Sequence, residues 1–185
     1  MRWRRLDVPG REEARIEQTP GGWRLTGDLE ADEAGVHMQL TYVIDCERDW
    51  RTRLANVTGA ASGSPIRFEF SADGGGHWRL DGDPIPLVRG ALDIDLGFTP
   101  ATNLLPIRRL NLAVGGRADI RTVWMRVPEL RVDALEQSYW READRVFRYA
   151  ALVDGKPFQA RLDTDAFGRV LLYEGLWEAE GGAAG

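Results

Sequence analysis

Hydrophobic and polar side chains alternate along much of the chain, and no long stretch shows the 3.6-residue period of an amphipathic helix. The alternation is strict in residues 36–42 and 66–70. It predicts strands that turn one face toward a core and the other toward water. Further strands are predicted at residues 23–29, 51–57, 77–80, 92–96, 110–114, 123–127, 130–135, 146–152, 158–163 and 170–173. The chain should therefore contain about a dozen short strands.

Short clusters of glycine, proline and aspartate separate these segments, and regular spacing of strands and turns is typical of a mainly β fold. One segment departs from the alternation. Residues 99–106 allow a single helical turn at most, with Thr99 as its N-cap, Pro100 in its first position and Pro106 as its end. We expect this segment to be ordered and to cross between strands.

The length of 185 residues predicts one domain, which we place at residues 1–178, followed by a flexible Ala/Gly/Glu-rich tail at residues 179–185. No run approaches 18 apolar residues, and no apolar segment follows the basic N-terminus, so neither a membrane span nor a signal peptide is expected. Cys46 is the only cysteine and cannot form an internal disulfide. These features together predict a cytoplasmic protein with no integral membrane segment.

The charge of the chain argues against nucleic acid as a partner. The formal net charge is −5, and the basic residues, all arginine except Lys156, are spread along the sequence instead of being clustered. There is no CxxC motif or Cys/His cluster, so neither a metal nor a cofactor is predicted. His37 and His77 lie outside any nucleophile motif, and the GxSxG elbow is missing. These motifs give no reason to predict an enzyme.

The densest distinctive run extends from Gly90 to Leu110 and contains the pattern DxDLGxTPxTNxLPIRRL. Together with HWRLDG (77–82), WRRLD (3–7), WRTR (50–53) and LLYEGLW (171–177), this run resembles the bacterial putative glycolipid-binding family across nearly the whole chain. The resemblance implies one large curled antiparallel or mixed sheet, a spiral β-roll or partial barrel with at most short helical turns, similar to half-barrel carriers of lipids. It also implies a non-enzymatic protein that binds a glycolipid or another amphipathic small molecule in the concavity of the roll.

Two acidic side chains in this run are candidates for function. Asp93 and Asp95 alternate with apolar residues in a predicted strand, so they share one face about 7 Å apart. In a structural interpretation, they form bidentate hydrogen bonds with Arg108 and Arg109 and tie segment 99–106 to the sheet. They could instead contact a polar ligand or form a catalytic carboxylate pair. We favour the structural interpretation and keep all four residues as candidate ligand contacts.

Thr99 and Asn103 can cap the local backbone, as such residues often do in turns, or can hold a sugar or phosphate head group. Trp78 is one of several tryptophans spread over the predicted strands, most of which should fill the inside of a curled sheet. A large roll can also leave an interior for an apolar ligand, with arginine at the rim facing a phosphate or carboxylate head group. The predicted ligand-binding residues are Trp78, Asp93, Asp95, Thr99, Asn103, Arg108 and Arg109. No catalytic or metal-binding residue is predicted.

Two other functions stay open from the sequence. An enzyme could act on a small polar substrate through Asp93, Asp95 and Arg108. A protein–protein interaction module with a filled core would have no cavity above about 300 Å³. An exposed strand edge of an open roll could also pair with a second copy and form a homodimer.

Overall fold

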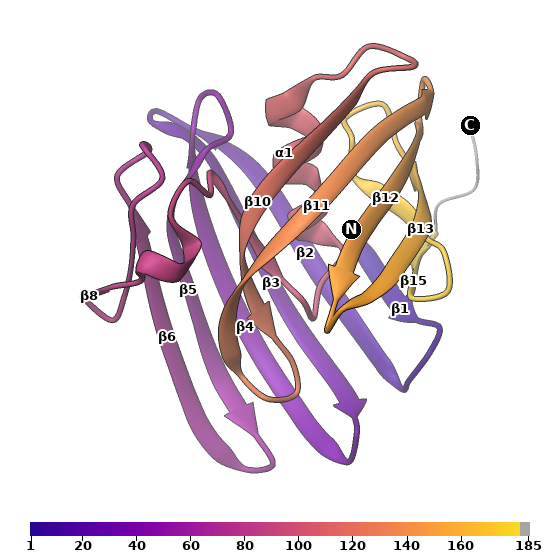
Figure 1. Cartoon of the computed structure of the whole chain (residues 1–185). Coiled ribbons are helices and arrows are strands. Elements are labelled where there is room, and N and C mark those ends of the chain that lie inside the picture. Colours follow the sequence, from indigo (N-terminus) through magenta and orange to yellow (C-terminus); the bar gives the residue numbers. More distant parts are fainter. Residues whose placement is uncertain (182–185) are drawn as a thin grey trace.

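The computed structural model describes residues 1–181 and shows one sheet of fifteen strands that curls on itself (Figure 1). This confirms the predicted mainly β roll with only short helical segments. The strands are β1 (Arg2–Arg5), β2 (Gly10–Thr19), β3 (Gly22–Glu33), β4 (Val36–Glu47), β5 (Thr52–Ala61), β6 (Ser64–Ala72), β7 (Trp78–Leu80), β8 (Asp83–Pro84), β9 (Asp93–Leu96), β10 (Arg117–Arg126), β11 (Arg131–Ala143), β12 (Val146–Val153), β13 (Lys156–Thr164), β14 (Val170–Tyr173) and β15 (Trp177–Glu180). The helical segments are η1 (Pro86–Val88), η2 (Ala101–Asn103) and α1 (Leu104–Leu110).

The strands follow one another around the sheet in chain order, from β1 to β8 on one side and from β15 back to β9 on the other. β1 pairs with β15 where the two sides meet. The sheet is mixed, because β9 and β10 are parallel and the other neighbours are antiparallel. The Thr52 amide donates to the Leu92 carbonyl at 3.0 Å, but the described sheet has no ladder between β5 and β9, so the roll is not closed. In residues 1–181, no helix has the length and apolar character needed to cross a membrane.

The long strands show why alternation builds this roll. On β3, Leu25 is buried on the concave face, whereas the neighbouring Arg24 is exposed. Gly27 lies opposite Tyr42 of β4, and a Cβ at Gly27 would lie only 2.4 Å from the Tyr42 ring. The glycine therefore leaves room for this ring to extend across β3, so that its hydroxyl reaches Glu12 on β2.

The segment after β9 fills the concavity, with η2 and α1 between the two sides of the curled sheet (Figure 1). The prediction that Pro106 ends the helix is wrong, because α1 continues to Leu110. A proline in the first turn lacks only an amide that has no partner within the helix. The helix ends at Asn111, which has a φ of 44° and donates its amide to the Ile107 carbonyl. The strand predicted at residues 110–114 is therefore also wrong.

Strands β1, β2, β8 and β15 lie outside the segments predicted as strands. In β2 the concave positions 10, 12, 14 and 16 hold glycine, glutamate, alanine and isoleucine, so the alternation carries little hydrophobic signal. β15 pairs with β1 and extends to Glu180, so its last two residues lie within the segment 179–185 that the sequence predicts to be a flexible tail. The rest of that predicted tail, from residue 182 onward, lies outside the described residues.

Candidate ligand-binding site

The wall of the roll has an opening beside the start of β1, at Arg2. β1 pairs with β2 only as far as Glu13, and the backbone of Met1 exchanges two further hydrogen bonds with Ala14. β2 continues to Thr19, so in the described sheet residues 15–19 pair with β3 on one side and with no strand on the other. This strand edge borders a gap in the wall.

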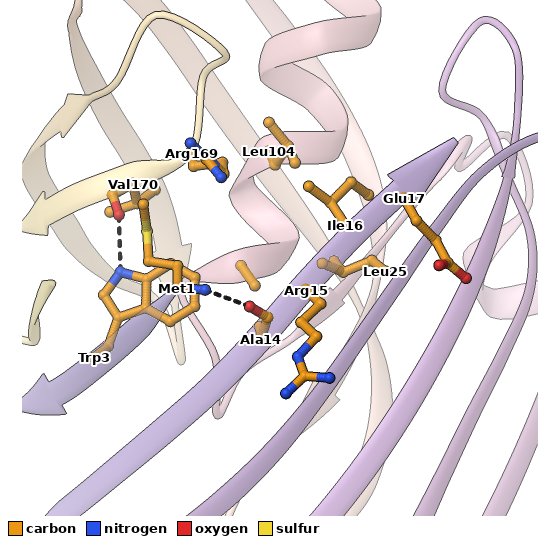
Figure 2. A pocket seen from close by; sticks show the side chains of 11 residues that line it. Met1, Trp3, Ala14, Arg15, Ile16, Glu17, Leu25, Leu104, Arg169 and Val170 are labelled. Carbon is orange, nitrogen blue, oxygen red and sulfur yellow. Dashed lines mark hydrogen bonds between the residues drawn. The ribbon is translucent and has the colours of Figure 1, made fainter. Parts of the chain in front are cut away.

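A pocket of about 350 Å³, here called the lateral pocket, lies at this opening (Figure 2). Across from β2, the indole Nε1 of Trp3 donates to the Val170 carbonyl at 2.8 Å and joins β1 to the start of β14. Leu104 of α1 lies on the inner side (Figure 2). The apolar lining residues are Met1, Trp3, Ala14, Ile16, Leu25, Ala101, Leu104 and Val170, and the charged ones are Arg15, Glu17 and Arg169.

Both arginines of the lateral pocket bind carboxylates outside its lining. Arg15 lies 3.1 Å from Glu13, and Arg169 lies 2.6 Å from Asp165. The lining is otherwise mostly apolar, which is typical of pockets that bind small molecules through hydrophobic contact. The lateral pocket therefore offers an apolar surface to a ligand, with charged groups as a minority.

A buried acid on β2 holds the crossing segment against the sheet. Oε1 of Glu12 accepts hydrogen bonds from the Tyr42 hydroxyl at 2.5 Å and from the Thr99 hydroxyl at 2.6 Å. Oε2 is buried and has no hydrogen-bond partner among the described residues. Burial raises the pKa of Glu12 to about 7, although the bonds from Thr99 and Tyr42 act in the opposite direction. Thr99 also accepts the amide hydrogen of Ala101 at 2.9 Å, although the N-cap residue of η2 is Pro100, one position later than the sequence predicts.

The two candidate aspartates, Asp93 and Asp95, have different hydrogen-bond partners. Asp93 is fully buried and receives a forked hydrogen bond from Arg109, with Nη2–Oδ2 at 2.6 Å and Nε–Oδ1 at 3.0 Å. This contact ties α1 to β9, as the structural interpretation predicts. Asp95 instead accepts from Gln137 at 2.5 Å, so its predicted pairing with an arginine is wrong. Burial raises the pKa of Asp95 to about 6.

Trp78 and Asn103 are also engaged by the protein itself. The indole of Trp78 is buried and donates to the Ala91 carbonyl at 2.9 Å. The amide oxygen of Asn103 accepts from the buried Tyr139 hydroxyl at 2.9 Å. Both contacts fix the packing of the roll and leave little of either side chain for a ligand.

Arg108 alone among the seven predicted residues lines a pocket described here, and that pocket is distinct from the lateral pocket. Sequence reasoning missed the lateral pocket because its lining comes from β1, β2, β3, the η2–α1 segment and the start of β14. The run WRRLD at residues 3–7, which contains Trp3, is the sequence feature nearest to this pocket. The other lining residues carry no motif.

Comparison with known proteins places the chain among relatives. Residues 1–179 match the sequence model of a family described as "Putative glycolipid-binding". The chain belongs to this family. The crystal structure of a DUF1089 family protein from Pseudomonas aeruginosa is similar to it, with 33% sequence identity, a TM-score of 0.81 and coverage of 91% of each chain. No match was found among curated proteins.

The description of this family refers to binding and specifies no reaction. In this member of the family, the residues at 1–181 contain no cluster of three His, Cys, Asp or Glu side chains arranged to hold a metal ion.

Proposed function

We propose that the protein binds an amphipathic, lipid-like molecule whose apolar part enters the lateral pocket, and that it does so without catalysing a reaction. The observation that carries this proposal is the pocket itself, a mostly apolar space that opens through the wall of the roll beside the start of β1. Membership in a family described as glycolipid-binding supports it.

The size of the pocket indicates the kind of apolar group. Ligand pockets range from about 300 to 1,000 Å³, and this one, at about 350 Å³, is near the lower end. It suits one hydrocarbon chain better than several. The concavity beyond it is occupied by α1 and its buried apolar side chains. We therefore assign the ligand to the side of the roll instead of to the centre of the concavity.

Binding of dodecyl maltoside, a single-chain sugar amphiphile, tests the proposal. The detergent is titrated below its micelle-forming concentration and followed by native mass spectrometry and calorimetry, with one molecule expected per chain. Ile16→Trp places a larger side chain in the lining and should weaken binding about tenfold or more, which corresponds to about 1.4 kcal/mol. Ile66→Trp is the matched control, because Ile66 is also a half-buried strand isoleucine but lies outside the pocket.

Two results would contradict the proposal. The wild-type protein could fail to bind the amphiphile at any concentration below micelle formation. Alternatively, both isoleucine variants could bind as the wild type does, which would place the amphiphile elsewhere on the surface.

A further inference from the structure

Arginine side chains on this protein are almost all neutralised by carboxylates. Within residues 1–181, ion pairs with N–O distances up to 4.0 Å include every arginine except Arg48, Arg79, Arg89 and Arg108. The first three are exposed, whereas Arg108 is partly buried. Its Nε is buried with no hydrogen-bond partner, and its Nη1 reaches only the Phe167 carbonyl, at 3.5 Å. A buried donor without an acceptor is uncommon in folded proteins and needs a reason.

Two aromatic rings hold the Arg108 guanidinium in position. Its Cζ lies 4.8 Å from the centroid of the Phe167 ring and 5.3 Å from that of Trp50. Trp50 in turn stacks on Trp23, with the ring centroids 4.6 Å apart. Cation–π contacts stabilise the charge through the ring faces and do not use the N–H donors. The guanidinium is therefore fixed in place, while its Nη groups have no acceptor among the described residues except the distant Phe167 carbonyl.

Arg108 lines a second pocket of about 130 Å³, here called the arginine pocket, between the end of α1 and the turn at residues 164–168. The ionised side chains in its lining are Arg108, Arg141, Asp144, Arg145 and Asp165. Asp144 binds Arg141 at 3.0 Å, and Asp165 binds Arg169 outside the pocket at 2.6 Å. Arg145 lies 3.9 Å from Asp144, beyond hydrogen-bond distance. Both carboxylates are thus engaged, while Arg108 and Arg145 have donors to spare.

The geometry points to an oxyanion site: we propose that the arginine pocket binds a phosphate or phosphate monoester through Arg108 and Arg145. Guanidinium groups donate parallel N–H bonds to phosphate oxygens and keep their charge at any physiological pH. A volume of about 130 Å³ holds about four water-sized groups, which is enough for a phosphate and too little for a hydrocarbon chain.

The phosphate has two conceivable sources, a free anion or the head group of an amphiphile. Leu104 lines the lateral pocket and Arg108 the arginine pocket, and residues four apart share one face of a helix. Gly168 packs between the two pockets, because a Cβ on it would lie 3.1 Å from Ile107 and 3.4 Å from Leu104. One amphiphile could reach both pockets over this glycine.

Calorimetry in phosphate-free buffer of low ionic strength tests the site with three probes. Inorganic phosphate carries the anion alone, dodecyl maltoside carries the chain alone, and dodecyl phosphate carries both. The variants are Arg108→Met, which keeps an apolar side chain against the aromatic rings, and Arg145→Gln, whose half-exposed side chain has no packing role to lose. Arg89→Gln is the control, because Arg89 is exposed and also lacks a carboxylate partner.

The expected result is that Arg108→Met and Arg145→Gln each weaken binding of the phosphate probes, by about tenfold for Arg108, while Arg89→Gln does not. Dodecyl maltoside should bind all four proteins equally. If dodecyl phosphate binds more tightly than both inorganic phosphate and dodecyl maltoside, the natural ligand of the arginine pocket is the head group of an amphiphile. If dodecyl phosphate binds only as tightly as inorganic phosphate, the natural ligand is a free anion.

The proposed oxyanion site is refuted if inorganic phosphate and dodecyl phosphate bind both pocket variants as they bind the wild-type protein. It is also refuted if neither of these two probes binds the wild-type protein. Dodecyl maltoside binding in that second case would leave the proposed function intact. Conversely, phosphate binding that depends on Arg108, without any binding of dodecyl maltoside, would support the oxyanion site and refute the lateral pocket as a chain site.

Discussion

The buried carboxyl of Glu12 predicts that the protein loses stability as the pH rises through the neutral range. Glu12→Gln is the informative change, because glutamine has the shape of glutamate and cannot ionise. Its amide oxygen can still accept hydrogen bonds from Tyr42 and Thr99, which bind Oε1 in the native protein. The substitution therefore removes the titration and keeps the hydrogen-bonded link between β2, β4 and the segment before α1.

The sign and size of the effect follow from the raised pKa. In an unfolded chain the carboxyl of Glu12 loses its proton near pH 4.5, whereas burial keeps the proton on the folded protein until about pH 7. The folded state binds more protons than the unfolded state between these values, so its stability falls as the pH rises through this range. The contribution is complete below about pH 4.5 and lost above about pH 7. A shift of this size corresponds to about 3 kcal/mol.

Urea unfolding followed by tryptophan fluorescence from pH 4.5 to pH 8 measures this effect. The difference in unfolding free energy, variant minus wild type, should increase by about 3 kcal/mol across the range. Asp95, whose raised pKa acts in the same direction, is present in both proteins and cancels in the difference. Glu13→Gln is the control, since the half-exposed Glu13 has a pKa lowered by hydrogen bonds from Arg15 and Arg2. Parallel stability curves for Glu12→Gln and wild type would refute the reasoning.

Two further predictions concern other buried groups. Asp93→Asn leaves Arg109 without its charge partner and should lower the unfolding free energy, measured in urea titrations, by about 3 kcal/mol. This value is at the lower end for a broken buried pair because Arg109 keeps some contact with water. A loss below about 1 kcal/mol would mean that the pair does not anchor α1. Burial raises the pKa of Cys46 to about 12, so its thiol should stay unreactive toward a disulfide reagent at pH 8 and react fully in denaturant, and rapid labelling of the native protein would contradict this.

Sequence patterning predicts the fold where apolar side chains line the concave face. β14 lies at residues 170–173 as predicted, because apolar residues fill it and a turn precedes it. β2 escapes prediction because one of its concave positions holds Glu12, a polar residue whose burial depends on Tyr42 and Thr99 from distant segments. Pro106 misleads for a related reason, since its effect depends on where the helix begins.

The candidate site is less accessible to sequence reasoning. The pairing of Asp93 with Arg109 could be predicted because both residues lie in one distinctive run of sequence. The lateral pocket exists because β1 is shorter than β2, and a difference in strand length leaves no motif. Arg108 stands out only once the partners of the other arginines are known, since its sequence neighbour Arg109 has the same charge and an entirely different environment.

The pairing of β1 with β15 has a consequence for biosynthesis. Most other neighbours in the sheet are close in the chain, so their hairpins can form soon after translation. β1 must wait for β15 (Trp177–Glu180), the described strand that lies farthest from it along the chain, and until then it presents an unpaired edge on that side. Pairing of β1 with β15 closes the longest loop in the described sheet, so we expect it to be the slowest step in the formation of the sheet. Until this pairing forms, the exposed edge of β1 leaves the chain open to aggregation.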